Sequence, residues 1–267
     1  MLVSAPYAYL AAAGIDPHAV RVATLGNNPS IDTATQPEDV WSGAQLGLLN
    51  GVDHKFIPRP QSALAMEVVS DNANDTAAGT GARTVIIGYL DANYAAKTTV
   101  RTLNGTTAVA LPENVMRVNS VIVVTAGTFG GNNIGNISVR AAGGAGSTYS
   151  YMTAGFGLAR SSAFTVPADA IFDVLSMLLS INRTDTQDRW GTFTLCVQNS
   201  AGRLIKGIEL SASTVTPYRH EAADVPLNVV AAKTDVWVRC EAVSQNSTNV
   251  TAGLFGVQRL GLPVSII

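Results

Sequence analysis

Apolar and polar residues alternate along most of the chain from residue 63 onward. The alternation is clearest between Ala63 and Leu111, where short runs of Gly, Asn and Asp interrupt it at close intervals. A period of two places successive side chains on opposite faces of a β-strand, and Gly, Asn and Asp are the residues that tight turns use. The pattern therefore predicts a meander of half-buried strands joined by turns.

The same pattern continues to the end of the chain. The run 115–125 is almost continuously apolar, which is typical of a central strand, and 171–183 also has a helical spacing, although strands on both sides favour a strand there. The predicted strands are 64–70, 83–91, 97–103, 106–111, 115–125, 134–140, 149–153, 163–166, 171–183, 190–198, 203–212, 227–230, 235–244 and 250–257.

Strands this closely spaced leave no room for the helices that a parallel α/β sheet needs. We therefore predict an all-β fold. Residues 63–267 are expected to form an antiparallel, jelly-roll-like β-sandwich, in which two sub-sandwiches joined near residue 167 are an alternative to one body.

Residues 1–62 have a different character. They hold six of the 11 prolines, and regular periodicity is poor, so only a short helix near residues 7–13 is expected. The segment is nevertheless too apolar for a disordered tail. We predict an extended N-terminal arm that becomes ordered on a neighbouring surface. An arm that packs on its own domain accounts for the same residues.

Composition narrows the classes of function. Charged residues make up 13% of the chain, hydrophobic residues 47%, and the formal net charge is −2. A surface covered by small neutral polar groups is only weakly repelled by copies of itself, which suits an assembly subunit. No run of Lys or Arg could follow a phosphate backbone, and no apolar window is long enough for a membrane helix. We expect a soluble protein that binds neither nucleic acid nor membrane.

No catalytic motif stands out. The three histidines belong to no nucleophile or zinc motif, and carboxylates are scattered without a recognisable pair, so we expect neither an enzyme nor a cofactor. Cys196 and Cys240 lack metal-site spacing and are expected to be buried free thiols, with a disulfide as the alternative. The oxygen-rich loop Asp71–Thr76 has a composition suited to Ca²⁺, but Asx turns explain it without a metal.

Four sequence blocks together resemble a group of structural proteins from tailed-bacteriophage virions. They are EDVWSG at 38–43, ANDTAAGTGARTV at 73–85, LNGTT at 103–107 and FTVPA at 164–168. Members of this group are capsid decoration proteins, head fibres, and tail or neck fibres. The likeness covers residues 38–183, and Asp169 stands where members typically have glycine.

This resemblance implies a non-enzymatic virion protein that forms a homotrimer. Its N-terminal part would attach it to the capsid, the portal or an adaptor at the head-to-tail junction. Buried aromatic and aliphatic anchors supply most of the energy of an interface. The residues expected to bind this partner are Val40, Trp41, Leu46, Leu48 and Leu49. Packing of Trp41 on its own β body is the alternative.

A second class of function fits the same chain. A receptor- or glycan-binding module at a fibre tip would use exposed aromatic side chains as its binding surface. The candidates for that role are Tyr149, Tyr151, Phe156 and Trp190.

Overall fold

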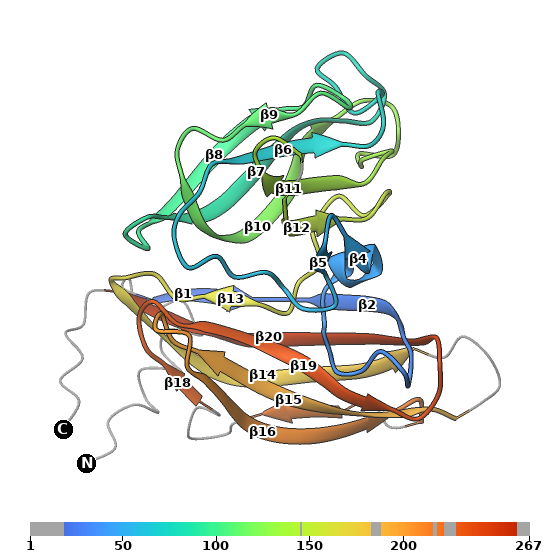
Figure 1. Ribbon diagram of the computed structural model, residues 1–267, viewed down its shortest axis with the longest axis vertical. Helices are drawn as coiled ribbons and strands as arrows, with labels where there is room; N and C mark the ends of the chain where they lie inside the picture. The colour runs from blue at the N-terminus through green and yellow to red at the C-terminus, as the bar shows by residue number, and fades with distance from the viewer. Residues whose placement is uncertain (1–18, 145, 183–187, 216–217, 222–227, 261–267) are drawn as a thin grey trace. The chain divides into compact units, whose positions relative to one another are not determined.

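A computed structural model describes residues 19–144, 146–182, 188–215, 218–221 and 228–260, with the side chains of 218–221 and 228 left aside (Figure 1). The chain divides into two compact units. Unit 1 comprises Met1–Val40 and Ser162–Ile267, and unit 2 comprises Trp41–Ser161. No helix within the described ranges is long and apolar enough to cross a membrane.

Unit 1 contains a six-stranded antiparallel sheet. Its main path runs β1 (Ala19–Ala23), β20 (Thr248–Leu260), β14 (Ala170–Asn182) and β17 (Tyr218–Glu221). In addition, β2 (Gly26–Ile31) pairs with β20, and β18 (Asn228–Val230) pairs with β14. The ladder between β14 and β20 is the longest, since it extends from Ala170 opposite Leu260 to Asn182 opposite Asn249.

A second antiparallel sheet of unit 1 has five strands. Its order is β13 (Phe164–Thr165), β19 (Asp235–Val243), β15 (Trp190–Gln198) and β16 (Leu204–Ser213), with β3 (Glu38–Asp39) paired to β19. Both sheets contribute side chains to one hydrophobic core, in which Phe172, Phe193, Val238 and Leu254 are fully buried. Burial of such side chains is the main stabilising contribution to the unit.

Unit 2 is built from shorter strands. A three-stranded sheet has the order β10 (Val115–Ala126), β7 (Ala82–Asp91) and β8 (Ala96–Thr102). A four-stranded sheet has the order β12 (Thr148–Met152), β11 (Ile137–Ala141), β6 (Met66–Ser70) and β9 (Val109–Ala110). The two sheets share a second core, with Met66, Ile87, Ile137 and Met152 among its buried members.

Three small elements complete unit 2. They are the 3₁₀ helix η1 (Ser42–Leu46) and the two-stranded hairpin of β4 (Leu48–Leu49) and β5 (Val52–Asp53). No α-helix occurs in the part of the chain that the structure describes. The prediction of an all-β chain with antiparallel sheets is confirmed, while the expected helix near residues 7–13 lies outside the described residues.

The arm boundary expected at residue 62 differs from the observed division. Residues 19–40 belong to unit 1, because β1 and β2 pair with β20 and β3 pairs with β19, and residues 41–62 belong to unit 2. The second boundary falls after Ser161, a few residues before the expected position near 167. Proline content indicated correctly that residues 19–62 form no long helix, but it did not indicate which distant strands these residues join.

The prediction that residues 115–125 form a central strand is wrong. In the three-stranded sheet β7 is central, and β10 buries only one face: Val121 is buried while Ile122 and Val124 are exposed. The predicted strand at 106–111 is also shorter, since only Val109–Ala110 pairs with β6. An apolar run shows that a strand is favoured, but it does not show which of its faces is covered.

Candidate functional site

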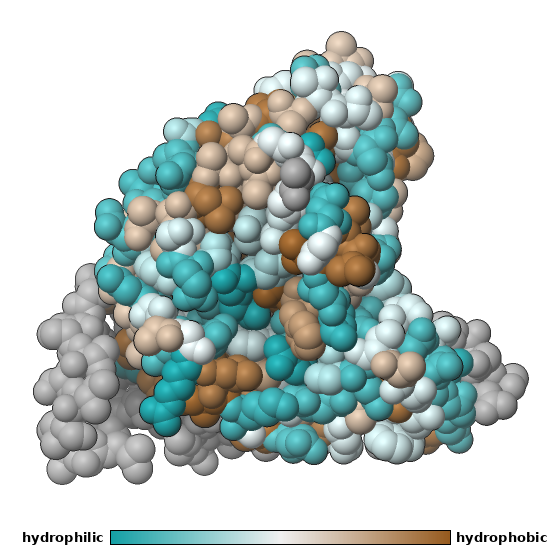
Figure 2. Space-filling view, viewed as in Figure 1, coloured by the Kyte–Doolittle hydropathy of each residue, from teal (hydrophilic) through white to brown (hydrophobic). Residues whose placement is uncertain are grey.

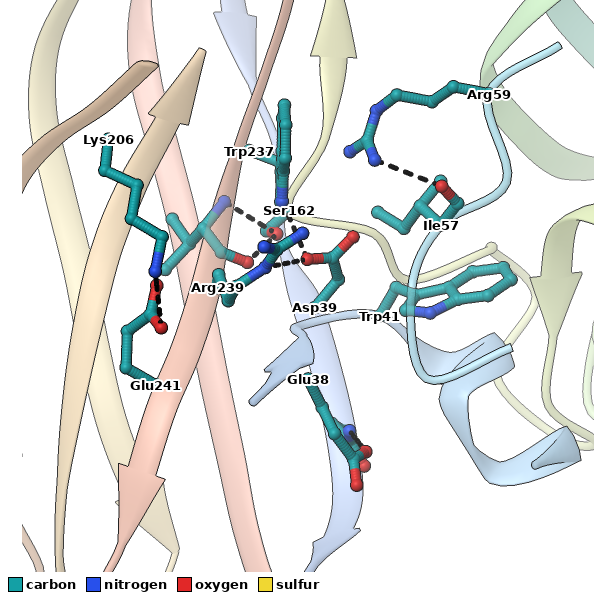
Figure 3. Close-up of polar contacts among 12 residues, drawn as sticks. Glu38, Asp39, Trp41, Ile57, Arg59, Ser162, Lys206, Trp237, Arg239 and Glu241 are labelled. Atoms are coloured by element: carbon teal, nitrogen blue, oxygen red, sulfur yellow. Dashed lines mark hydrogen bonds and ion pairs between the residues drawn. The ribbon is translucent and has the colours of Figure 1, made fainter. Parts of the chain in front are cut away.

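Trp41 is the first residue of unit 2, and its side chain is almost completely buried. Its indole Nε1 donates a hydrogen bond to the carbonyl oxygen of His54 at 3.0 Å. The ring packs with Ala44 and Tyr151, and Leu46 and Ile57 pack against this cluster. Figure 3 shows Ile57 beside the Trp41 ring. Gly43 is required beside it, because a Cβ atom there would lie 2.2 Å from the Trp41 ring.

His54 fixes the segment that follows Trp41. The side chain is fully buried, and Nδ1 lies 3.0 Å from the carbonyl oxygen of Val52. The amide of Thr148 in β12 donates to Nε2, also at 3.0 Å. Because a carbonyl only accepts and an amide N–H only donates, these two bonds select the neutral imidazole with its proton on Nδ1. His54 therefore joins the β4–β5 hairpin to the four-stranded sheet.

The β4–β5 hairpin carries exposed leucines on this fixed base. Asn50 and Gly51 form its turn with φ of 52° and 76°, which is the left-handed geometry that an Asn-Gly turn adopts readily. Leu48 is 77% exposed and Leu49 is 38% exposed. In the space-filling view, hydrophobic residues gather over the place of η1 and β4 (Figure 2).

A pocket of about 440 Å³ opens beside η1 within unit 2. Its size is in the range of small-molecule sites. The lining combines an apolar side chain and an aromatic ring with groups that donate and accept hydrogen bonds. Its wall includes Leu46, Asp71, Thr106, Asn136, Arg140 and Tyr151.

The charged side chains in the pocket wall form hydrogen bonds with neighbouring residues. Glu67 accepts a hydrogen bond from Nε of Arg140 at 2.8 Å, and Asp71 accepts from the backbone and side-chain nitrogens of Asn136. Burial raises the pKa of the Tyr151 hydroxyl, and the negative charge of Asp71 raises it further. The phenol thus remains protonated and able to donate at neutral pH.

The glycine-rich loop between β6 and β7 is organised around one buried carboxylate. Asp75 accepts hydrogen bonds from the hydroxyl of Ser70 and from the amides of Ala82, Ile134 and Gly135, at 2.6 to 2.9 Å. Gly81 lies so close that a Cβ atom would be 2.1 Å from Oδ1 of Asp75.

The blocks ANDTAAGTGARTV and LNGTT meet in this loop. The amide of Gly105 donates to the carbonyl of Asp75, and Thr76 bridges to Asn104. An Asx turn is also present, since Oδ1 of Asn72 accepts from the amide of Asn74. Among the described residues, no group of three or more His, Cys, Asp or Glu side chains is placed to hold a metal ion. Protein donors bind the loop's carboxylates, which explains its composition without Ca²⁺.

The EDVWSG block also contributes to unit 1. Oδ1 of Asp39 accepts from Nε1 of Trp237 at 2.7 Å and from Nε of Arg239 at 2.8 Å (Figure 3). Burial alone would lower the pKa of Arg239, but the adjoining Asp39 carboxylate outweighs burial and the pKa is raised. Glu38 accepts from the side-chain amide of Asn28 at 2.7 Å.

The five residues predicted to bind a partner are not equivalent in the structure. Val40 and Trp41 are buried within their own units, and Leu46 is half-buried beside the pocket. Only Leu48 and Leu49 are exposed. The alternative in which Trp41 packs on its own chain therefore describes what is found, and contact of the hairpin with a partner stays a prediction.

The candidate glycan-binding aromatics are divided between the units. Tyr151 lines the pocket, and Phe156 is exposed with the guanidinium of Arg160 3.7 Å above its ring. Trp190 is exposed on β15 of unit 1. Cys196 and Cys240 are buried free thiols, as predicted.

Sequence reasoning singled out the loop Asp71–Thr76 but missed the structural roles of Asp75 and His54, and it missed the Asn50-Gly51 turn. The Asn-Gly dipeptide is a visible hairpin signal. His54 and Asp75 have no comparable signal, because most of their partners are backbone groups, some more than fifty residues away.

Comparisons with known proteins give no family. No family model matches the chain, and no curated protein matches it. Among solved structures, the CBM22-1 and GH10 modules of a Clostridium thermocellum endo-1,4-β-D-xylanase, complexed with xylohexaose, have a TM-score of 0.21 at 12% identity. That match covers 75% of this chain, which spans only 30% of the xylanase chain.

Two further structures have similar scores. The PBSX exported protein XepA has a TM-score of 0.18 at 10% identity, covering 89% of this chain and 84% of its own. A particle of infectious bursal disease virus has a TM-score of 0.20 at 8% identity, covering 91% and 68%. Likenesses at this level carry no argument about function.

Proposed function

We propose that this chain is a structural, non-enzymatic component of a tailed-bacteriophage virion, a fibre or decoration protein that attaches to the capsid or the head-to-tail junction. The observation that carries the proposal is the β4–β5 hairpin, which presents Leu48 and Leu49 to solvent on a base fixed by His54 and Trp41. A rigid element that exposes large aliphatic side chains loses little conformational entropy when it binds a partner.

The proposal narrows the attachment surface that was expected from the sequence. Val40 and Trp41 stabilise the units themselves, so the attachment surface is assigned to Leu48 and Leu49. The low proportion of charged residues supports an assembled subunit, and the likeness of four sequence blocks to virion proteins supports its class. A homotrimer is part of this proposal on the strength of that likeness.

The finer architecture belongs to the same proposal. In each unit two antiparallel sheets contribute to one hydrophobic core, which supports a pair of jelly-roll-like β-sandwiches. Residues 19–62 of the expected arm belong to the two units themselves.

The attachment can be tested in the phage that encodes this chain. The double variant Leu48→Ser with Leu49→Ser should lower its copy number in purified particles at least about tenfold, because both apolar anchors are lost. Quantitative mass spectrometry of the particles measures this. The matched control is Val20→Ser, which removes an exposed aliphatic residue from unit 1. Normal incorporation of a correctly folded double variant would show that the hairpin is not the attachment surface.

A second candidate is a receptor- or glycan-binding module, which the pocket of unit 2 favours. Tyr151, Arg140 and Asn136 would supply an aromatic surface and donors, and Asp71 an acceptor, for a polyhydroxylated ligand. An array of bacterial surface glycans tests it. Binding by the unaltered chain that Tyr151→Phe weakens would support the pocket, and an array without any binding would reject this candidate.

A further inference from the structure

One face of the three-stranded sheet in unit 2 carries a continuous aliphatic row. The ladders place Val100 of β8 opposite Ile86 of β7, and Ile86 opposite Ile122 of β10. Leu158 bridges to Ile122 from the other side of β10, which extends the row across a fourth segment. Val100, Ile122 and Leu158 are 52%, 46% and 41% exposed, and Ile86 is half-buried. These four residues face solvent and not the core.

Hydroxyl side chains flank this aliphatic row on both sides. On one side Thr102, Thr84 and Thr125 lie in register, and the hydroxyls of Thr84 and Thr125 are 2.6 Å apart. On the other side the registered residues are Thr98, Gly88 and Ser120. We name the aliphatic row and its two hydroxyl rows the neutral face. None of its ten residues is ionisable.

The edge strand β8 shows that this neutrality is unusual. Its ionisable residues, Lys97 and Arg101, pair with Tyr89 and Val85, whose side chains are on the core side of the sheet. An exposed sheet face and an edge strand normally carry charges outward, because charges prevent association with other chains. Here the charges of β8 are on the opposite side, and the outward positions are Thr98, Val100 and Thr102.

We propose that the neutral face binds the neutral face of a second copy of this chain, in a face-to-face contact related by a two-fold axis. Such a contact needs groups that complement themselves. Aliphatic side chains do so, and a hydroxyl both donates and accepts, whereas a charged row would repel its copy. The absence of charge on all ten residues therefore favours an identical face over a charged partner.

The size of the neutral face sets the strength of the contact. Three strands about 4.8 Å apart, each contributing about five residues of about 3.3 Å, cover about 240 Å², and Leu158 extends the face by one further residue. A stable interface buries about 800 Å² per partner. The contact is therefore expected to be weak between free chains and to be reinforced where many copies are held close together. It is distinct from the trimer of the proposed function, because a three-fold axis does not pair identical faces.

Sedimentation velocity of the full chain, from about 10 μM to about 1 mM, tests this contact. The unaltered chain should show reversible pairing that increases with concentration. Ile122→Glu and Ile122→Lys should each lower pairing at least about tenfold, because each buries a charge in the aliphatic row. An equimolar mixture of the two should restore pairing, since opposite charges then meet within one row.

Matched controls place the same charges on an exposed residue of unit 1. Val20→Glu and Val20→Lys alter β1, which belongs to neither proposed surface, and should leave pairing unchanged. Ile122→Thr, which retains a β-branched side chain, should weaken pairing and guards against a folding defect in the charged variants. Circular dichroism checks that every variant is folded.

Three results would overturn the inference. They are an unaltered chain that does not pair at the highest concentration, pairing that Val20→Glu abolishes but Ile122→Glu does not, and a mixture of the Ile122 variants that stays unpaired. None depends on whether the chain is a virion protein, since incorporation into particles is measured separately through Leu48 and Leu49.

Discussion

Each unit has a fully buried aspartate, Asp173 in unit 1 and Asp75 in unit 2, and the two are stabilised in different ways. In unit 1, Asp173 is fully buried and faces the guanidinium of Arg259, with Nε 2.6 Å from Oδ2 and Nη2 2.9 Å from Oδ1. In unit 2, Asp75 is equally buried but is bound by three backbone amides and the Ser70 hydroxyl. The charge of Asp173 is thus compensated by a cationic side chain, and the charge of Asp75 by the amides of folded loops.

This difference determines how substitutions near each carboxylate destabilise the unit that contains it. An ion pair can be broken by changing one distant residue without altering the backbone around it. A carboxylate held by amides depends on the loop geometry itself, and here that geometry also requires glycine at position 81. We therefore expect substitutions in the Asp75 loop to have larger and more local effects than substitutions in the ion pairs.

The largest effect is expected for Asp75→Ala. It leaves three buried amides without their acceptor and should lower the free energy of unfolding by about 4 kcal/mol. Chemical denaturation measures the loss, and hydrogen exchange should show it in peptides of unit 2. Gly81→Ala should reproduce most of it, because its Cβ displaces the Asp75 carboxylate. A loss below about 1 kcal/mol for both would show that the loop is not held by this carboxylate.

A somewhat smaller effect is expected for Arg259→Leu in unit 1. The variant leaves Asp173 buried without its cation, which should cost about 3 kcal/mol. Its control is Lys206→Met, which removes the exposed partner of Glu241 and should cost less than about 1 kcal/mol. If Arg259→Leu increased hydrogen exchange more in unit 2 than in unit 1, this result would contradict the separation drawn between the units.

Alkaline pH should distinguish the units further. Burial raises the pKa of the Cys196 and Cys240 thiols in unit 1 to about 12. A thiol with a raised pKa keeps its proton in the folded chain, so its stabilising contribution is complete below the ordinary thiol pKa and is lost as pH rises toward about 12. At about pH 10, each thiol should therefore lower the free energy of unfolding by about 1 to 2 kcal/mol relative to neutral pH, which chemical denaturation measures.

Cys240→Ala provides the check on that pH dependence. The variant should be less stable than the unaltered chain at neutral pH and should lose less stability between about pH 8 and about pH 10. In unit 2, burial and the hydrogen bond to Glu113 raise the pKa of Tyr89 to about 12, so its contribution is lost only above the ordinary tyrosine pKa. An unchanged pH dependence in Cys240→Ala would rule out this thiol as its source.

The smallest effect is expected at the hairpin turn. Gly51→Ala places a Cβ atom on a residue with φ of 76°, which should cost about 1 kcal/mol. Nothing lies within 4 Å of that Cβ, so the cost is conformational alone. A stability equal to that of the unaltered chain would show that the hairpin relaxes easily. This would weaken its assignment as a rigid attachment surface.

Local patterns predicted the strands well and their partners poorly. The strand expected at 190–198 has the bounds of β15, and 171–183 differs from β14 by one residue at each end. Alternation is a local property, so it survives any arrangement of sheets. The pairing of β1 with β20 joins residues more than two hundred positions apart, and no local pattern specifies it.

The candidate site follows the same rule. Leu48 and Leu49 could be named from their apolar character, which the sequence shows locally, although the adjoining Asn50-Gly51 turn was not recognised. The burial of Trp41 could not, since it depends on Tyr151 and on the backbone of His54. Likewise Asp39 meets Arg239 across two hundred residues, so the block EDVWSG indicated a family likeness but not the contacts that its residues make.

The chain leaves unit 1 after Val40 and returns to it at Ser162, and these two residues share a backbone hydrogen bond of 3.0 Å. Likewise Trp41 and Ser161, the ends of unit 2, form a β-bridge. Unit 2 is therefore an insertion whose ends are adjacent, placed between two strands that pair with the same neighbour, β19. In evolution, a segment of this kind could be gained, lost or exchanged without changing the strand order of either sheet of unit 1.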